Sequence, residues 1–240
     1  FQACGLDGSA QAMDSSSVSA TAVALKNAGT TTVLCICGAG NLASLMSSSQ
    51  QQGYFPEWMV DATLAENLDS SLGTAQGSTA GYPPSQMSHI IGITFDNKIN
   101  PPEQEFWYNA IREVNHSYTY GDNAFDEWDQ FRYEQMLIVF SGLQAAGPDL
   151  TPETFANGLY NDQFSDPGHG QAPYYQALVG FSPDEHWFFK DAAAIWADAQ
   201  ATNYTTNEPR TGSFCYSRGG QRSTTWQDVS PTFYGGQSCR

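Results

Sequence analysis

Two short segments have the residue types and the spacing expected of a ligand-binding edge. Gly38–Asn41 follows an apolar, uncharged run over Thr30–Cys37, and Asp61–Thr63 closes a second candidate strand over Phe55–Asp61. The intervening residues Leu42–Gln52 predict a helix, so the order strand, glycine turn, helix, strand is a βαβ unit. Ligands of open parallel sheets bind at the carboxyl ends of the strands. We therefore predict that any ligand is bound by these two segments.

The same residues also have a purely structural interpretation. Asn41 is a suitable N-cap for the helix that follows it, and Gly53 is a suitable residue to end that helix. Asp61 can likewise cap a further helix predicted over Ala62–Leu72, in which case Gly38–Asn41 is only a tight turn. The sequence leaves both interpretations open.

Patterns that would support catalysis or metal binding are absent from the sequence. It contains no Gly-x-Ser-x-Gly elbow, no Walker loop and no visible pair of nucleophile and base. The acidic group from Asp122 to Asp129 lacks the glycine and the terminal glutamate of an EF-hand. We therefore expect no enzymatic activity, no metal and no cofactor. The histidines, none of which has metal-ligand spacing, are His89, His116, His169 and His186.

The composition indicates a secreted globular protein. The chain has 240 residues, of which 40% are hydrophobic and 13% aromatic, enough for one large domain or two small lobes. Nine basic and 25 acidic residues give a net charge of −16, which argues against nucleic acid and anionic membrane surfaces as partners. No apolar run approaches the ~18 residues that indicate a transmembrane helix.

Further elements must hold the candidate segments in place. Ala20–Asn27 predicts a helix that ends at Gly29, and the strand over Thr30–Cys37 is apolar enough to be buried on both faces. Ser88–Phe95 predicts a third strand after a loop over Ala75–Met87. Alternating strands and helices of this kind predict an α/β fold.

The second half of the chain is predicted to contain three helices. Glu103–Val114 and Glu127–Ala146 have broad apolar faces at helical spacing. Thr151 and Pro152 are suitable N-cap and first residues of a shorter helix that ends at Leu159. The side chains expected to need a packing partner are Phe106, Trp107, Ile111, Met136, Leu137, Val139, Phe140 and Leu143.

The last part of the chain predicts two hairpins. Tyr174–Phe181 and Ala192–Ala197 predict the first, with its turn over Pro183–His186. Thr202–Arg240 is poor in aliphatic residues, so we expect a surface-wrapping tail with a second hairpin around Cys215–Trp226.

The five cysteines predict disulfides and one free thiol. Cys215 and Cys239 both lie in the tail, where a disulfide would compensate for a small core, and we predict that they are bonded. Cys35 and Cys37 point to the same face of their predicted strand, so they are not expected to bond to each other. Cys4 can pair with either of them; alternatively, Cys35 and Cys37 are ordinary buried residues.

The order of these segments resembles the carboxy-terminal part of type I solute-binding proteins, and in particular the branched-chain amino-acid (Leu/Ile/Val) binding proteins of ABC importers. The resemblance rests on the lysine-bearing helix that ends in Ala28-Gly29, the apolar strand, the glycine turn and the run Gln-Gly-Tyr-Phe-Pro at 52–56. It extends over Ala12–Gln200. It implies the Rossmann-like lobes of a type I periplasmic-binding-protein fold, with the first lobe, which would precede Phe1, largely missing.

The resemblance also implies a domain organisation. Residues 1–97 would be the carboxy-terminal lobe, built of βαβ units, and residues 98–172 would be helices that belong to the first lobe. Residues 173–201 would return to the carboxy-terminal lobe as a terminal hairpin, and 202–240 would be a disulfide-stapled tail. The helices of 98–172 would be covered by the missing first-lobe segment or by a protein partner.

Individual ligand contacts follow from the same resemblance. If Asp61 meets the ligand, it can accept a hydrogen bond from an ammonium group; if Ala62 does, that carboxylate is absent. The tyrosine that the family often places in the glycine turn is missing here. Trp128 could line the cleft between the lobes, or it is an ordinary core or surface aromatic. The implied contacts are Gly38, Ala39, Gly40, Asn41, Asp61, Ala62 and Thr63.

We therefore expect an extracellular or periplasmic solute-binding protein of an ABC importer. It would bind a small polar ligand such as an amino acid in a cleft between lobes, and a membrane permease would be a further partner. The alternative is a binding fold that has lost its ligand and serves as a structural or assembly subunit of an extracellular complex. A hydrolase is the weakest hypothesis, because no nucleophile–base pair is visible.

Overall fold

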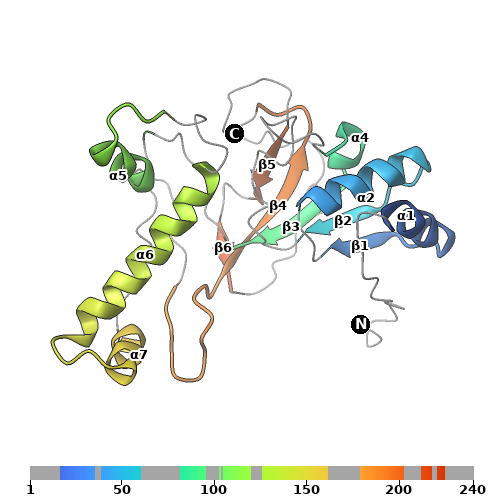
Figure 1. Ribbon diagram of the computed structural model, residues 1–240. Coiled ribbons are helices and arrows are strands. Elements are labelled where there is room, and N and C mark those ends of the chain that lie inside the picture. The colour runs from blue at the N-terminus through green and yellow to red at the C-terminus, as the bar shows by residue number, and fades with distance from the viewer. Residues whose placement is uncertain are drawn as a thin grey trace.

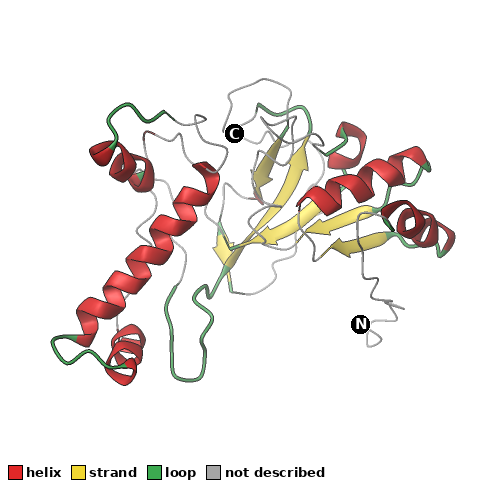
Figure 2. Cartoon of the chain, in the orientation of Figure 1, coloured by secondary structure: helices red, strands yellow, loops and turns green. Residues whose placement is uncertain are grey.

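The computed structural model describes residues 17–35, 39–60, 82–95, 103, 105–119, 126–161, 179–202, 212–217 and 221–224. These residues form an open mixed sheet with helices packed on it, and a second group of helices beside it (Figure 1; Figure 2). In this part of the chain, no helix is both long and apolar enough to cross a membrane.

A six-stranded sheet is the centre of the fold, in the order β1-β2-β3-β4-β5, with β6 also paired to β4. The first three strands, β1 (Thr32–Cys35), β2 (Glu57–Val60) and β3 (Ile90–Thr94), are parallel, so the predicted βαβ unit is confirmed. β4 (Ala192–Asp198) runs antiparallel to β3. The three parallel strands therefore end at the same edge of the sheet.

The two helices that pack on this sheet end as the sequence predicts. α1 (Val18–Asn27) is followed by Gly29 with a φ of 68°, and α2 (Ala39–Gln51) by Gly53 with a φ of 61°. The residue after each glycine donates its N–H to a carbonyl five residues back, at 3.1 Å after α1 and 2.9 Å after α2. This is a Schellman motif, and its left-handed position favours glycine because glycine has no Cβ.

The start of α2 differs from the prediction. The helix begins at Ala39, so Asn41 lies in its first turn and is not the N-cap of a helix that starts at Leu42. The predicted turn residues Ala39, Gly40 and Asn41 are thus helical. Ser44 Oγ donates to the carbonyl oxygen of Gly40 at 2.8 Å, within the first turns of the helix. The expected N-cap is therefore wrong by about one helical turn.

One face of the sheet packs against α1 and α2 and forms the described core. The other face is more accessible: Leu34 of β1 is 43% exposed, and Met59 and Ile91 beside it are partly exposed. The prediction that the first strand is buried on both faces is wrong, because among the described residues α1 and α2 cover only one face of β1. The large side chains of the core are Trp58, Val60, Ile90, Ile195, Phe214, Leu42 and Met46.

The carboxy-terminal segment belongs to the main sheet. β5 (Ser213–Tyr216) pairs with one half of β4, and β6 (Arg222–Ser223) pairs with the other half, along the same edge. The predicted hairpin around Cys215–Trp226 is therefore wrong, because both strands pair with β4. Phe214 is only 1% exposed, so β5 adds to the core. Most of the predicted tail over 202–240 lies outside the described residues.

The first predicted hairpin is also only partly correct. Val179 bridges to Phe189 and Ser182 bridges to Glu185, which places a turn at Pro183-Asp184 as predicted. β4 is not the second strand of this hairpin, because β3 occupies one of its edges and β5 and β6 occupy the other.

A single helical turn, α4 (Pro84–Met87), lies in the segment predicted as loop. Proline is tolerated in the first turn of a helix, where its missing N–H has no partner to lose. The buried side chain of Gln86 donates to Tyr54 O at 2.9 Å and accepts from Trp58 Nε1 at 2.8 Å. A turn this short is marginal alone, so this buried network stabilises it.

The remaining helices form the second group in Figure 1: α5 (Phe106–Val114), α6 (Asp126–Ala146) and α7 (Pro152–Asn161). α6 and α7 pack closely because Gly142 faces the Phe155 ring. Thr151 caps α7 as predicted: its Oγ1 accepts from Thr154 N at 3.1 Å.

Of the eight side chains predicted to need a packing partner, five are exposed, Ile111 and Leu137 are half-buried, and Trp107 is buried. Trp107, predicted to need a partner, is 4% exposed and packs edge-on against Tyr108 at 5.9 Å. Trp107 is therefore covered within this chain, and the prediction that it needs a partner from outside is wrong. The exposed apolar side chains, with their exposed fractions, are Phe106 at 49%, Met136 at 49%, Val139 at 41%, Phe140 at 57% and Leu143 at 37%.

Candidate functional site

The carboxyl ends of the parallel strands lie next to one another. The register places Cys35 beside Val60, and Val60 beside Gly92. The chain therefore leaves the sheet at the same edge after β1 and after β2. We call this the carboxyl edge, and both predicted ligand-binding segments follow these strands in the sequence.

Of the predicted ligand contacts, the structure describes Ala39, Gly40 and Asn41. They form the first turn of α2, and Gly40 and Asn41 are exposed. The first N–H groups of a helix have no intrahelical acceptor and carry partial positive charge. This turn thus offers hydrogen-bond donors to an anionic group at the carboxyl edge. The predicted contacts Gly38, Asp61, Ala62 and Thr63 lie outside the described residues.

Gly92, in the middle of β3, allows that strand to approach the end of β2 closely. A Cβ atom at this position would lie 2.3 Å from Val60 O and 2.6 Å from Val60 Cγ2. Any larger residue would separate the two strands where the candidate site begins. The sequence analysis missed this role, although a glycine inside an apolar strand signals close approach of another backbone.

Trp128 belongs to the first turn of α6, in the helical group beside the sheet. Its side chain lies outside the described part of the structure. That Trp128 lines the cleft between the lobes therefore stays a prediction.

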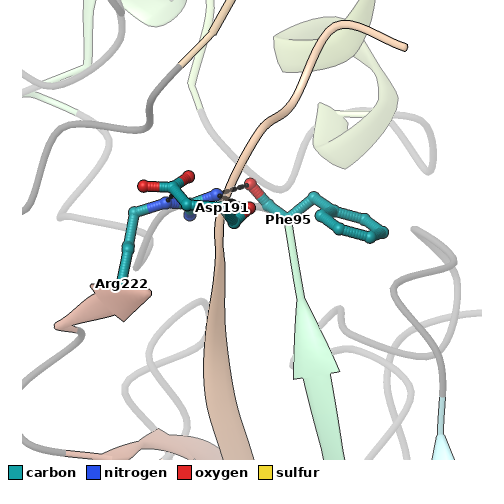
Figure 3. A network of polar contacts seen from close by, with 3 residues as sticks. All are labelled: Phe95, Asp191 and Arg222. Carbon is teal, nitrogen blue, oxygen red and sulfur yellow. Dashed lines mark hydrogen bonds and ion pairs between the residues drawn. The ribbon is translucent and has the colours of Figure 1, made fainter. Parts of the chain in front are cut away.

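A buried ion pair lies where the sheet meets the rest of the chain (Figure 3). Arg222 Nε donates to Asp191 Oδ1 at 2.8 Å, and Arg222 Nη2 donates to Phe95 O at 2.8 Å and to Asp191 O at 3.0 Å. The side chains of Arg222 and Asp191 are only 2% and 10% exposed. Several charge-assisted bonds from one planar guanidinium fix its geometry.

Aromatic side chains gather around Phe95 beside this ion pair. The Phe95 ring lies edge-on to Trp187 at 5.5 Å and stacks on Phe189 at 6.1 Å. Trp187 is 58% exposed. The sequence analysis singled out neither the ion pair nor this group; the run Trp187-Phe188-Phe189 just before a strand was the available signal.

Tyr54 lies at the opposite edge of the sheet, before β2 begins. Its hydroxyl donates to Thr30 O at 2.8 Å, and burial raises the pKa of Tyr54 above its ordinary value of 10.0. This tyrosine therefore joins the segments that precede β1 and β2 and takes no part in the candidate site.

Among the described residues, no group of three or more His, Cys, Asp or Glu side chains is placed to hold a metal ion. His116 Nδ1 lies 2.6 Å from Arg112 O, and His186 stacks on Tyr160 at 6.1 Å. These two histidines therefore have local packing and hydrogen-bonding roles.

Both cysteines in the described part of the chain, Cys35 and Cys215, are disulfide-bonded. They lie on β1 and β5, which are separated by three strands. Neighbouring strands are about 4.8 Å apart, whereas the Cα atoms of a disulfide lie within about 7 Å. The two cysteines therefore do not bond to each other. Cys4, Cys37 and Cys239 lie outside the described residues, so the individual pairings stay predictions.

Comparison with known proteins shows a likeness in fold and none in sequence. No protein-family model and no curated protein matches the sequence. A substrate-binding protein of an ABC transporter from Aeropyrum pernix matches with a TM-score of 0.56 and 11% identity, over 91% of this chain and 51% of that one. The structure of a branched-chain amino-acid ABC transporter from Thermus thermophilus, with bound valine, matches with a TM-score of 0.55 and 12% identity. The match covers 90% of this chain and 52% of that one.

A fatty-acid ABC transporter substrate-binding protein from Thermomonospora curvata matches with a TM-score of 0.54 and 17% identity, over 86% of this chain and 46% of that one. The chain thus spans about half the length of the solved structures that it matches. Together with the mixed α/β sheet, this likeness confirms the expected fold class. The chain has the fold of type I ABC-transporter substrate-binding proteins, over about half of their length.

Proposed function

We propose that this chain is part of an extracytoplasmic solute-binding protein of an ABC importer and has no catalytic activity. The observation that supports this most is the carboxyl edge, where three parallel strands end in a fold shared with substrate-binding proteins. Open parallel sheets bind their ligands at that edge. A membrane permease would be the partner that receives the solute.

The ligand is proposed to be a small polar molecule with a carboxylate, such as an amino acid. The amino end of α2 offers N–H donors at the carboxyl edge, which suit an anionic group. Asp61 would accept a hydrogen bond from the ligand's ammonium group, and Trp128 would line the cleft. Valine in the Thermus thermophilus structure is a ligand of this class. The proposed contacts are Gly38, Ala39, Gly40, Asn41, Asp61, Ala62, Thr63 and Trp128.

We propose that a first lobe covers the apolar face of α6. Met136, Val139, Phe140 and Leu143 recur at helical spacing and are all exposed, while α6 packs against α7 and α5. Leaving one such side chain in water forfeits about 1.5–3 kcal/mol. A first lobe, encoded in a longer chain or present as a separate segment, would bury this stripe; a separate protein partner is the alternative.

The proposed location is extracellular or periplasmic. Cys35 and Cys215 are disulfide-bonded, and disulfides persist mainly in oxidising compartments outside the cytosol. A strongly acidic chain with net charge −16 is also consistent with a freely diffusing binding protein.

The second candidate function is a ligand-less structural or assembly subunit of an extracellular complex. The observation that favours it is the segment Gly38–Asn41, which has none of the aromatic side chains able to pack on a ligand. In this case the exposed stripe on α6 would bind a partner protein.

A thermal-shift screen of the natural polypeptide with amino acids, ureas and polyamines separates these two functions. A solute-binding protein gains stability as RT ln(1 + [L]/Kd), about 2.7 kcal/mol at a hundredfold excess over Kd. We expect at least one compound to raise the melting temperature, and Asp61→Asn to reduce that rise. Glu153→Gln, which removes an exposed carboxylate on α7, is the matched control and should leave the rise unchanged. No shift with any compound would favour the structural subunit.

A further inference from the structure

Two connections between the sheet and the helices α5–α7 lie side by side. The chain leaves the sheet at Phe95, directly after β3, and returns at Asp191, directly before β4. β3 and β4 are antiparallel neighbours, and Thr94 at the end of β3 pairs with Ala193 near the start of β4. Two neighbouring connections between two units can act as a hinge, because small backbone rotations there move one unit as a body.

We infer that Arg222 is a positioning residue that fastens this hinge. Its guanidinium binds the carbonyl oxygen of Phe95 on one connection, and the carboxylate and carbonyl oxygen of Asp191 on the other (Figure 3). β6 places it there, since Arg222 pairs with Ala193 of β4. One rigid, planar group from the carboxy-terminal segment thus holds both connections at a fixed separation.

Aromatic packing reinforces the same junction. Phe95 on the first connection contacts Phe189 and Trp187 on the segment that leads into the second. The segment also reaches the helical group, because His186 stacks on Tyr160 of α7. The orientation of α7 relative to the sheet therefore depends on the position of this segment, which Arg222 holds at Asp191.

The ion pair Lys190–Glu185 provides an internal comparison. It has a similar distance of 3.0 Å, but its side chains are 20% and 58% exposed, and both residues belong to the same segment between Val179 and Asp191. Exposed pairs of this type contribute little to stability and here would not join the two connections. Lys190 is therefore a matched control for Arg222.

The purpose assigned to the hinge rests on the proposed function. In a protein that closes around a solute, the ratio of open to closed forms sets the apparent affinity. The hinge itself can be tested without any ligand, so its failure is distinguishable from the failure of the proposed function.

The test is a distance measurement by pulsed electron paramagnetic resonance in the natural polypeptide. Spin labels are attached through a ketone-bearing amino acid at Gln51 on α2 and Gln144 on α6, both exposed, which leaves the cysteines untouched. We expect Arg222→Met to broaden and shift the distance distribution, and Asp191→Asn to do so to a smaller extent. Lys190→Met should give the distribution of the unmodified protein.

Hydrogen exchange of β2 and β3 separates a hinge effect from loss of folding. We expect their protection to be unchanged in Arg222→Met while the distances change. A distribution identical to that of the unmodified protein, or an equal effect of Lys190→Met, would overturn the inference. If Arg222→Met fails to fold, Arg222→Lys and Asp191→Asn decide, and unchanged distances in both would overturn it.

Discussion

Tyr54 shows how burial decides the behaviour of a single residue. Its side chain is 9% exposed and its hydroxyl donates to Thr30 O at 2.8 Å. Burial favours the neutral phenol and raises the pKa of Tyr54 above 10.0. The contribution of Tyr54 to the free energy of unfolding is therefore fully present below pH 10. It is lost as the pH rises through the raised pKa of Tyr54 in the folded protein.

We expect the free energy of unfolding to fall above pH 10 more steeply in the natural protein than in Tyr54→Phe. At pH 7 the variant should be less stable by about 1 kcal/mol, because Thr30 O loses its donor. Urea denaturation between pH 7 and pH 11 measures both effects. Tyr160→Phe, which removes a hydroxyl from an exposed contact, is the control. Equal slopes in the natural protein and Tyr54→Phe would contradict this prediction.

The cysteines give a second prediction at the residue scale. Because Cys35 and Cys215 are both bonded, and not to each other, we expect two disulfides and one free thiol among the five cysteines. Alkylation without reductant, followed by peptide mapping, should recover Cys215 linked to Cys239. Cys215 and Cys239 found as alkylated thiols would refute the pairing.

At the scale of elements, helix ends can be predicted from neighbouring residues, whereas strand pairing and contacts between distant residues cannot. Gly29 and Gly53 marked the helix ends correctly because a Schellman motif involves only neighbouring residues. The pairing of β5 and β6 was mispredicted because strand partners are chosen by the sheet as a whole. Arg222 and Phe95 are 127 residues apart in sequence, so no spacing rule could have joined them.

Two glycines in helices should respond to the same substitution in opposite ways. Alanine normally stabilises a helix by about 0.5–1 kcal/mol over glycine, and a Cβ at Gly40 would meet nothing within 4 Å. A Cβ at Gly142 would lie 2.6 Å from the Phe155 ring, and overpacking costs about 1–3 kcal/mol. We expect Gly40→Ala to raise the melting temperature and Gly142→Ala to lower it. Calorimetry of both variants checks this, and equal shifts would contradict the α6–α7 packing described.

At the scale of the whole molecule, the sheet half was predictable and the environment of the helices was not. The parallel order of β1, β2 and β3 follows from apolar runs separated by helices. What covers the α6 stripe is not encoded in the sequence of α6, because an apolar face only shows that some partner is needed.

The exposed stripe leads to a prediction for residues 1–240 expressed alone. Side chains such as Phe140, at 57% exposure, would remain in water, and their combined loss rivals the ~5–15 kcal/mol stability of a domain. We expect self-association and binding of a hydrophobic dye, measured by light scattering and fluorescence. Phe140→Glu should weaken both effects. A monodisperse monomer that binds no dye and unfolds in one sharp transition would contradict the proposed first lobe.

Hydrogen exchange with and without a stabilising compound tests the central claim, ligand binding at the carboxyl edge, most directly. The compound is the one that raises the melting temperature of the natural polypeptide most. We expect its addition to slow amide exchange in peptides that span Gly38–Asn41 and Asp61–Thr63, while peptides around Tyr54 at the opposite edge stay unchanged. Slowed exchange confined to another region, such as the segment around His186, or no change in any peptide, would contradict the account.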